Sequence, residues 1–235
     1  MRHGLILLLL AGVFVGISVA LGLRSLGGLC GVVTAVGLVG PGLAYVFGRP
    51  GVLGKRADGT IAAWARGLHA SYFALCRFGW LTQRGKGPDE VYPKLFVGPR
   101  ATPIQSLALR QHRSVATLDL TCELPELGTL RRGAYLCVPV LDGTPPTGPQ
   151  LDAAVAFIDQ HIADHNVFVH CAIGRGRSAT VAMAWLLARG EVADVEEAVS
   201  RLASKRPSIC PSAQQTLVVA NWHASVRMKP APADG

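Results

Sequence analysis

Near its N-terminus the chain has two long stretches without a charged side chain, and these limit most strongly how it can fold. The first, GLILLLLAGVFVGISVALGL, runs from Gly4 to Leu23, and the second, LGGLCGVVTAVGLVGPGLAYVF, runs from Leu26 to Phe47. Each has about 20 residues, the length that a helix needs to cross the hydrocarbon core of a bilayer. We therefore expect two transmembrane helices over residues 1–48, joined as a hairpin. Small residues of the second stretch would let the helices approach closely: Gly31, Gly37, Gly40 and Gly42.

Basic residues are placed unevenly around these two stretches. Arg2 precedes the first stretch and Arg49 and Lys55 follow the second, whereas only Arg24 lies in the turn between them. Cytoplasmic flanks of membrane helices carry an excess of lysine and arginine. The pattern predicts an integral membrane protein whose two ends face the cytoplasm. A cleaved signal peptide is the alternative for the first stretch. However, the apolar region of a signal peptide is usually shorter, and here a second apolar stretch follows at once.

The next segment is apolar and aromatic but not free of charge. Ile61 to Leu81 is interrupted by Arg66, His69 and Arg77, and its aromatic side chains suit the level of the lipid head groups. We interpret it as an interfacial helix, with a third span or a core helix as the alternatives. TQRGKGPDE follows and is typical of a linker, so residues 49–90 are predicted to hold an interfacial helix and a linker.

From Val91 the pattern changes to short apolar runs that alternate with amphipathic segments. LFVG, SVATLDL, AYLCVPV and NVFVH predict strands, whereas TGPQLDAAVAFIDQHIADH and ADVEEAVSRLASKR predict helices. Strands that alternate with helices indicate an α/β fold with a largely parallel sheet flanked by helices. We expect this domain over residues 91–228 and a disordered tail over 229–235.

The charge and the cysteines limit the ligands. The net charge of +8 favours anionic partners, such as anionic lipid or phosphorylated molecules. The basic residues are dispersed and have no interleaved aromatic platform, which argues against nucleic acid. The six cysteines include no C-x-x-C pair, and no histidine cluster has the spacing of a zinc site. We expect neither a disulfide framework, nor a metal, nor a cofactor.

One segment places a cysteine, two glycines and two arginines between a strand and a helix. In an open α/β sheet, ligands bind at the carboxyl ends of the strands, which is where NVFVH leads into Cys171. The amides of such a loop and the following helix N-terminus form an anion site. Gly174 and Gly176 allow positive φ and close backbone approach, and Arg177 adds a planar fork for phosphate oxygens. The same groups stabilise a Cys171 thiolate, which is placed to attack a bound phosphate.

The segment HCAIGRGRS, from His170 to Ser178, resembles the His-Cys-x5-Arg-Ser signature of cysteine-dependent phosphatases of the tyrosine and dual-specificity class. Its position after several βα units resembles the dual-specificity branch, and the resemblance covers about Val91 to Arg227. It implies a dual-specificity-phosphatase-like sheet behind the membrane hairpin. It also implies an enzyme that hydrolyses phosphate monoesters through a phosphocysteine intermediate, without a metal or cofactor.

The resemblance also implies roles for individual residues. Cys171 corresponds to the nucleophile, Arg177 to the phosphate-binding arginine, and Ser178 to the hydroxyl that helps the thiolate leave. The family's acid lies on a mobile loop upstream, where VPVLDGTPPTG offers Asp142, with Asp119 as the backup. The phosphate is expected to contact the loop residues Ala172, Ile173, Gly174, Arg175, Gly176 and Arg177.

The substrate is predicted less directly. Phosphoinositide-type members carry a lysine directly after the cysteine, whereas this loop has Ala172 and Ile173, with Arg175 as its extra cation. This departure favours a phosphorylated protein, including phosphotyrosine, as the partner. The membrane hairpin supports an anionic phospholipid head group instead, as in a phosphatidylglycerophosphate- or phosphoinositide-type lipid phosphatase. A catalytically silent phosphate-binding membrane scaffold is the third alternative.

Overall fold

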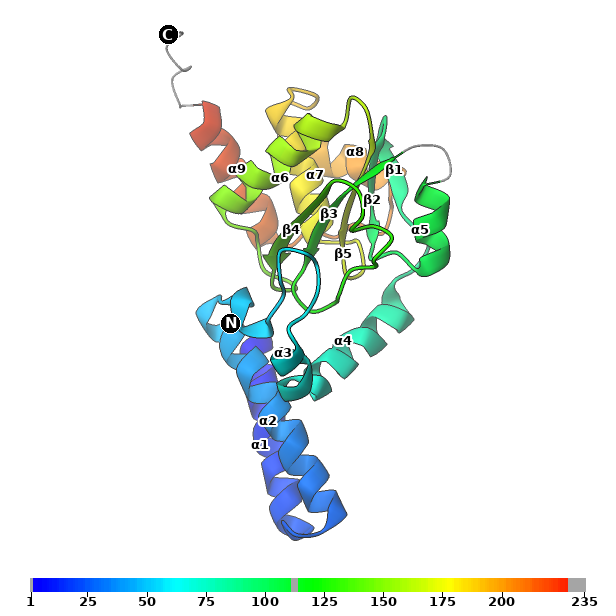
Figure 1. The fold of residues 1–235 in the computed structure, drawn as a ribbon. Helices are drawn as coiled ribbons and strands as arrows, with labels where there is room; N and C mark the ends of the chain where they lie inside the picture. The colour runs from blue at the N-terminus through cyan, green and yellow to red at the C-terminus, as the bar shows by residue number, and fades with distance from the viewer. Residues whose placement is uncertain (1, 111–113, 228–235) are drawn as a thin grey trace, which may run out of the picture.

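A computed structural model describes residues 2–110 and 114–227 and shows a helical hairpin that projects from an α/β domain (Figure 1). The hairpin consists of α1 (Arg2–Ala20) and α2 (Leu26–Phe47). Both helices are long and apolar enough to cross a membrane by length and composition. Most large apolar side chains of α1 are exposed. The predicted disordered tail, 229–235, lies outside the described residues.

Small residues let the hairpin and its neighbours pack closely. A Cβ added to Gly31 would lie 2.2 Å from Ser18 Oγ, and one added to Gly42 would lie 2.8 Å from the side chain of Leu8, so these two glycines face α1. The other two predicted glycines of α2 face the segment that follows instead: Gly37 faces Ser71, and Gly40 faces His69.

The segment after the hairpin forms η1 (Pro50–Leu53), α3 (Ala63–Leu68) and α4 (Ala70–Gln83). Two helices therefore stand where one interfacial helix is predicted, because His69 leaves helical geometry with φ −106° and ψ 27° and inserts its buried ring against α2. From this break α4 runs from the hairpin toward the α/β domain (Figure 1). Apolar side chains are exposed along α3 and α4, namely Trp64, Leu68, Leu75, Phe78 and Leu81.

The α/β domain is built on a five-stranded sheet with the strand order β1-β2-β5-β3-β4. β1 (Asp89–Tyr92) pairs antiparallel with β2 (Leu95–Pro99). The other strands are β3 (Val115–Thr121), β4 (Tyr135–Val140) and β5 (Asn166–Cys171). The remaining pairs are all parallel: β2 with β5, β5 with β3, and β3 with β4. This confirms the predicted mixed α/β fold with a mostly parallel sheet, and it brings the ends of β2, β5 and β3 to one edge.

Helices cover the sheet unequally. Between them, α6 (Gly148–His161), α7 (Arg177–Ala188) and α8 (Val195–Lys205) contact the strands, and α9 (Ala213–Arg227) packs on these helices. α7 follows β5 directly and is buried along nearly its whole length. α5 (Pro103–Arg110) lies at the side of the domain (Figure 1). Strand β5 alternates, so that Val169 and Cys171 belong to the core beneath α7, whereas Phe168 faces a separate cluster on the other side.

Candidate active site

The loop from Cys171 to Arg177 joins β5 to α7 at the carboxyl edge of the parallel strands. The Cys171 side chain is buried, and the backbone N–H of Gly174 donates to its sulfur over 3.3 Å. Ser178 Oγ, in the first turn of α7, lies 3.5 Å from the same sulfur. The loop therefore places two hydrogen-bonding groups next to the Cys171 sulfur.

Buried arginines and a close backbone approach hold the loop in shape. The Arg206 Nε–H donates to the Gly174 carbonyl over 2.9 Å, and the Arg100 N–H donates to the Cys171 carbonyl over 2.7 Å. Gly174 has a φ of +70°, and a Cβ there would lie 2.3 Å from the carbonyl carbon of Gly98. Only glycine satisfies both conditions, so the predicted positive φ is confirmed at Gly174.

At Gly176 the expected positive φ is wrong. Its φ is −108°, and the residue serves as the N-cap of α7. The side chain that limits this position is Gln215, whose Oε1 would lie 3.0 Å from an added Cβ. Gln215 is itself fixed, because its Nε2 donates to the Thr144 carbonyl over 3.0 Å. Glycine is needed here for space rather than for backbone conformation.

The Arg177 guanidinium lies beneath the loop, completely buried, and is fastened by a carboxylate. Its two terminal nitrogens donate to the two oxygens of Glu123 over 3.0 and 2.6 Å, and Nη1 also donates to the Val140 carbonyl over 2.7 Å. Within the described part of the chain, Nε–H has no hydrogen-bond partner. Burial alone would lower the pKa of Arg177, but the carboxylates of Glu123 and Asp142 outweigh it and raise that pKa further. The guanidinium thus stays charged, with one N–H free for an anion.

Glu123 is the site residue that sequence reasoning missed. It lies in TCELPELG, just after β3, is 3% exposed, and accepts a hydrogen bond from the Cys122 N–H over 2.9 Å. A glutamate among turn residues is ordinarily solvent-exposed, so its type and neighbours gave no sign of burial. Its partner Arg177 lies 54 positions later in the chain. Glu123 could have been found by asking which carboxylate neutralises Arg177, because a buried arginine needs a partner of opposite charge.

Asp142, the predicted acid, is brought to the loop. It lies two residues after the end of β4, its side chain is half-exposed, and Oδ1 lies 2.9 Å from Arg177 Nη2. Asp142 also lines the same pocket as Ala172 and Ile173 of the loop. The structure thus gathers Cys171, Arg177, Ser178 and Asp142 around one point, whereas the Arg175 side chain is directed to solvent.

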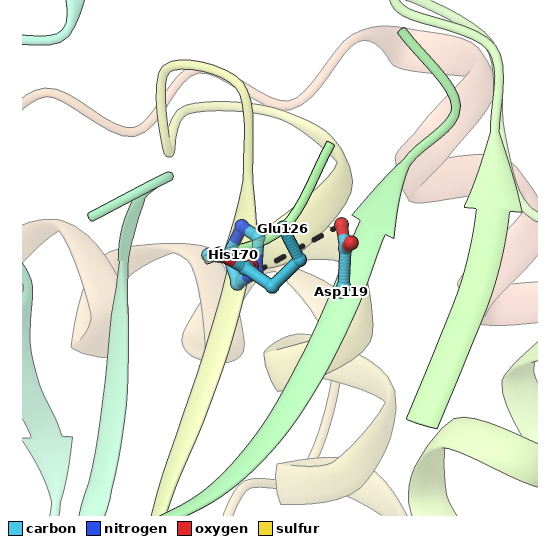
Figure 2. Close-up of side chains that lie close together, drawn as sticks. All are labelled: Asp119, Glu126 and His170. Atoms are coloured by element: carbon cyan, nitrogen blue, oxygen red, sulfur yellow. Dashed lines mark ion pairs between the residues drawn. The ribbon is translucent and has the colours of Figure 1, made fainter. Parts of the chain in front are cut away.

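Asp119, the backup acid, belongs to a buried charge network behind the loop (Figure 2). The Lys55 ammonium lies 2.7 Å from Asp119 Oδ2, and His170 Nε2 lies 2.5 Å from Glu126 and 3.8 Å from Asp119. Burial alone would raise the pKa of Asp119, but Lys55 and His170 hold it below its usual range. Burial would lower the pKa of His170, but the two carboxylates raise it overall. Asp119 is therefore a buried structural carboxylate, held by Lys55, that lies near the histidine before Cys171.

Asp119, Glu126 and His170 also lie close enough together to hold a metal ion. Lys55 argues against a metal ion here, because its ammonium already forms an ion pair with Asp119. The same ammonium also donates to Thr121 Oγ1 over 3.2 Å. A divalent cation would have to displace a buried lysine. These residues therefore do not fit a metal site.

Replacement of Lys55 by methionine should lower the free energy of unfolding by about 3–5 kcal/mol, because a buried carboxylate would lose its cation. The measurement is chemical unfolding of the full chain in detergent, with the exposed Lys86→Met as the matched control. Since the pKa of folded Asp119 is lowered, the ion pair stabilises above the unfolded pKa of about 3.9 and is lost as the pH falls. The penalty should therefore shrink on acidification. Equal stability of both variants at neutral pH would contradict the role of Lys55.

Helices α1, α2 and α4 form one wall of the site. A pocket of about 240 Å³ is bounded by the loop, by Glu123 and Asp142, and by side chains of α1, α2 and α4. Trp80 of α4 packs in a cluster with Leu124 and Ala172, and its indole N–H donates to the Arg100 carbonyl over 3.0 Å. The sequence does not predict this wall, because nothing local relates the hairpin to a loop near residue 171.

Comparisons with known proteins agree with this geometry. Dual specificity protein phosphatase 16 of Homo sapiens is 30% identical over 128 residues, which are 54% of this chain and 19% of that protein. The chain thus spans about a fifth of the length of this relative. The solved structure of the active form of Tk-PTP is 22% identical with a TM-score of 0.54, and the match covers 60% of this chain and 98% of that chain. PTPMT1 in complex with PI(5)P is 24% identical with a TM-score of 0.51, covering 58% and 94%, respectively.

These two structures share the fold of the α/β domain. The family model described as the catalytic domain of dual specificity phosphatases matches residues 99–224, a range that contains Cys171, Arg177 and Asp142. Because this range is more than half of the chain, the chain belongs to the dual specificity phosphatase family of cysteine-based phosphatases.

Proposed function

We propose that this chain hydrolyses phosphate monoesters through a phosphocysteine intermediate on Cys171. The observation that carries the proposal is the buried Cys171 sulfur, which accepts the Gly174 amide within a loop above a fully charged Arg177. That arrangement combines a nucleophile with an anion site, and phosphoryl transfer needs both.

In the first step, the loop amides and the free Nε–H of Arg177 bind the phosphate oxygens. The Cys171 thiolate attacks phosphorus, a P–S bond forms, and the P–O bond to the leaving group breaks. Protonated Asp142 gives its proton to the departing oxygen, and its position next to the arginine that binds the phosphate places it within reach of that oxygen.

In the second step, the Asp142 carboxylate takes a proton from a water molecule as that water attacks phosphorus. The P–S bond breaks, inorganic phosphate is released, and Cys171 returns to the thiolate. Ser178 Oγ, 3.5 Å from the sulfur, donates a hydrogen bond to this leaving thiolate. Asp142 thus acts as the acid in the first half-reaction and as the base in the second, and the protons balance.

We also propose that α1 and α2 cross the membrane and hold the catalytic domain at its cytoplasmic face. The exposed apolar surface of α1 and the basic residues beside both helix ends support this placement. In this arrangement residues 1–48 span the bilayer, residues 49–90 lie at its surface, and residues 91–228 form the catalytic domain.

Replacement of Asp142 by asparagine tests the mechanism. Turnover of p-nitrophenyl phosphate should fall by about 10²–10⁴-fold. The nitrophenolate leaves without much acid assistance, so hydrolysis of the intermediate should slow more than its formation. Rapid quenching followed by mass spectrometry should then find one phosphoryl group on Cys171. Asp164→Asn, at an exposed turn, should behave as wild type. Unchanged turnover, or a phosphoryl group on another residue, would overturn the proposed roles.

Two substrate classes are supported by different observations. The curated relative is named as a protein phosphatase, which agrees with the phosphorylated protein that the sequence predicts first. The lining of the catalytic pocket supports a lipid phosphate.

A further inference from the structure

The pocket above the catalytic loop is enclosed partly by the membrane hairpin. We infer that the substrate is a lipid phosphate whose phosphate lies on the loop while its apolar tail lies between α1, α2 and α4. The inference rests on the proposed phosphatase activity and names its substrate class.

The wall of the pocket is formed mainly by apolar and aromatic side chains. Ile6 and Leu7 of α1, Tyr45 of α2, and Tyr72 and Trp80 of α4 line it. The hydroxyls of Tyr45 and Tyr72 lie 3.4 Å apart and bond to each other. The Trp80 indole N–H is likewise used, on a backbone carbonyl. The wall therefore presents mainly apolar surface, which stabilises a hydrocarbon tail in proportion to the area removed from water.

A peptide fits this wall poorly. Each residue of a bound peptide brings a backbone N–H and C=O, and a buried polar group without a partner costs about 1–3 kcal/mol. The two carboxylates that line the pocket, Glu123 and Asp142, lie next to Arg177. Both carboxylates are already held by that guanidinium. A tail without polar groups avoids the penalty.

The helices that form the wall also offer a lipid a path from the bilayer to the pocket. α1 begins beside the catalytic domain (Figure 1), and the ring of His3 lies next to Gly143, directly after Asp142. Leu5 and Leu9 of α1 and Phe78 of α4 are exposed on the helices that form the wall. A lipid that contacts these exposed side chains can move its phosphate to the loop without withdrawing its tail into water.

Basic side chains lie beside the pocket. A second pocket of about 340 Å³ shares Ile173 with the first, and its lining includes Arg84, Lys86 and Arg175. Arg84 also lies over the Trp80 ring, 5.1 Å from its centroid. Cations beside an aromatic, apolar wall are the arrangement found where proteins meet anionic head groups. The side of the site nearest the bilayer is thus apolar in its wall and basic at its rim.

The variant Gly79→Leu tests where the tail lies. Gly79 lines the pocket from α4, and an added Cβ would meet only Gln83 Nε2, at 3.8 Å, so a leucine fits the helix and fills the pocket. The matched control is Gly67→Leu on α3, where an added Cβ meets nothing within 4 Å and the position is exposed. The full-length chain in detergent micelles is assayed on dioleoyl phosphatidate, on a phosphotyrosine peptide and on p-nitrophenyl phosphate.

Wild type should prefer phosphatidate to the phosphotyrosine peptide by at least about tenfold in kcat/KM, and Gly79→Leu should lower the ratio of phosphatidate to p-nitrophenyl phosphate activity by about 10–200-fold. Gly67→Leu should leave that ratio unchanged. Preference for the peptide, or an unchanged ratio in Gly79→Leu, would overturn the lipid inference. Turnover of p-nitrophenyl phosphate would in that case still support the proposed phosphatase activity. No release from any of the three substrates would overturn both proposals.

Discussion

Replacement of Cys171 by serine is expected to reduce phosphate release from p-nitrophenyl phosphate by at least about 10³-fold. A serine hydroxyl is not ionised at neutral pH, so the variant has no anion to attack phosphorus. The fold should persist, because serine has nearly the same shape and can keep the contacts of the sulfur with the Gly174 amide and the Ser178 hydroxyl. The measurement is phosphate release by the full-length chain in detergent, with circular dichroism of both proteins.

Cys210→Ser is the matched control, because this cysteine is exposed and its thiol is free. It should retain wild-type turnover. Substantial activity in Cys171→Ser would show that another group attacks phosphorus, and the phosphocysteine mechanism would fall.

Replacement of Glu123 by alanine should lower the free energy of unfolding strongly. The buried Arg177 guanidinium would lose both of its hydrogen bonds to Glu123, of 3.0 and 2.6 Å. Removal of one partner from a buried ion pair costs about 3–5 kcal/mol, because the other charge stays buried without compensation. Activity should fall too, since Arg177 would no longer be held beneath the loop. Chemical unfolding and phosphate release measure the two effects.

The exposed Glu196→Ala is the control and should change the free energy of unfolding by less than about 1 kcal/mol. A double variant, Glu123→Ala with Arg177→Met, separates charge from packing. It should recover much of the lost stability because no charge remains unpaired, and it should stay inactive because no guanidinium binds phosphate. A Glu123→Ala variant as stable as wild type would contradict the assigned ion pair.

Local patterns were sufficient to predict much of this molecule. The hairpin follows from two uncharged stretches, the α/β fold from alternating periodicities, and the loop from glycines and Arg177 directly after a strand. Asp142 was predicted from the resemblance to the phosphatase family, whose acid lies on a loop upstream of the cysteine, and its role stays a prediction. The orientation of the hairpin and the division into three regions stay predictions.

The residues that were missed depend on contacts between distant segments. Glu123 lies 54 positions from Arg177, and Lys55 lies 64 positions from Asp119. Neither pairing leaves a periodic trace, because a single charged side chain in a loop looks like any solvent-exposed residue. The apolar wall was missed for the same reason: Trp80 suits a membrane interface and a pocket equally well, and only the fold places it on Ala172.

The burial of Lys55 has a consequence for the order of biosynthesis. The ribosome makes this lysine directly after the hairpin, long before it makes Glu126 and His170 of the same network. Chains fold from the N-terminus as they emerge, so the lysine must stay solvated until its partners in the sheet have been made. The hairpin helices are thus made before the loop around Cys171, and the network behind that loop can close only when both parts of the chain are present.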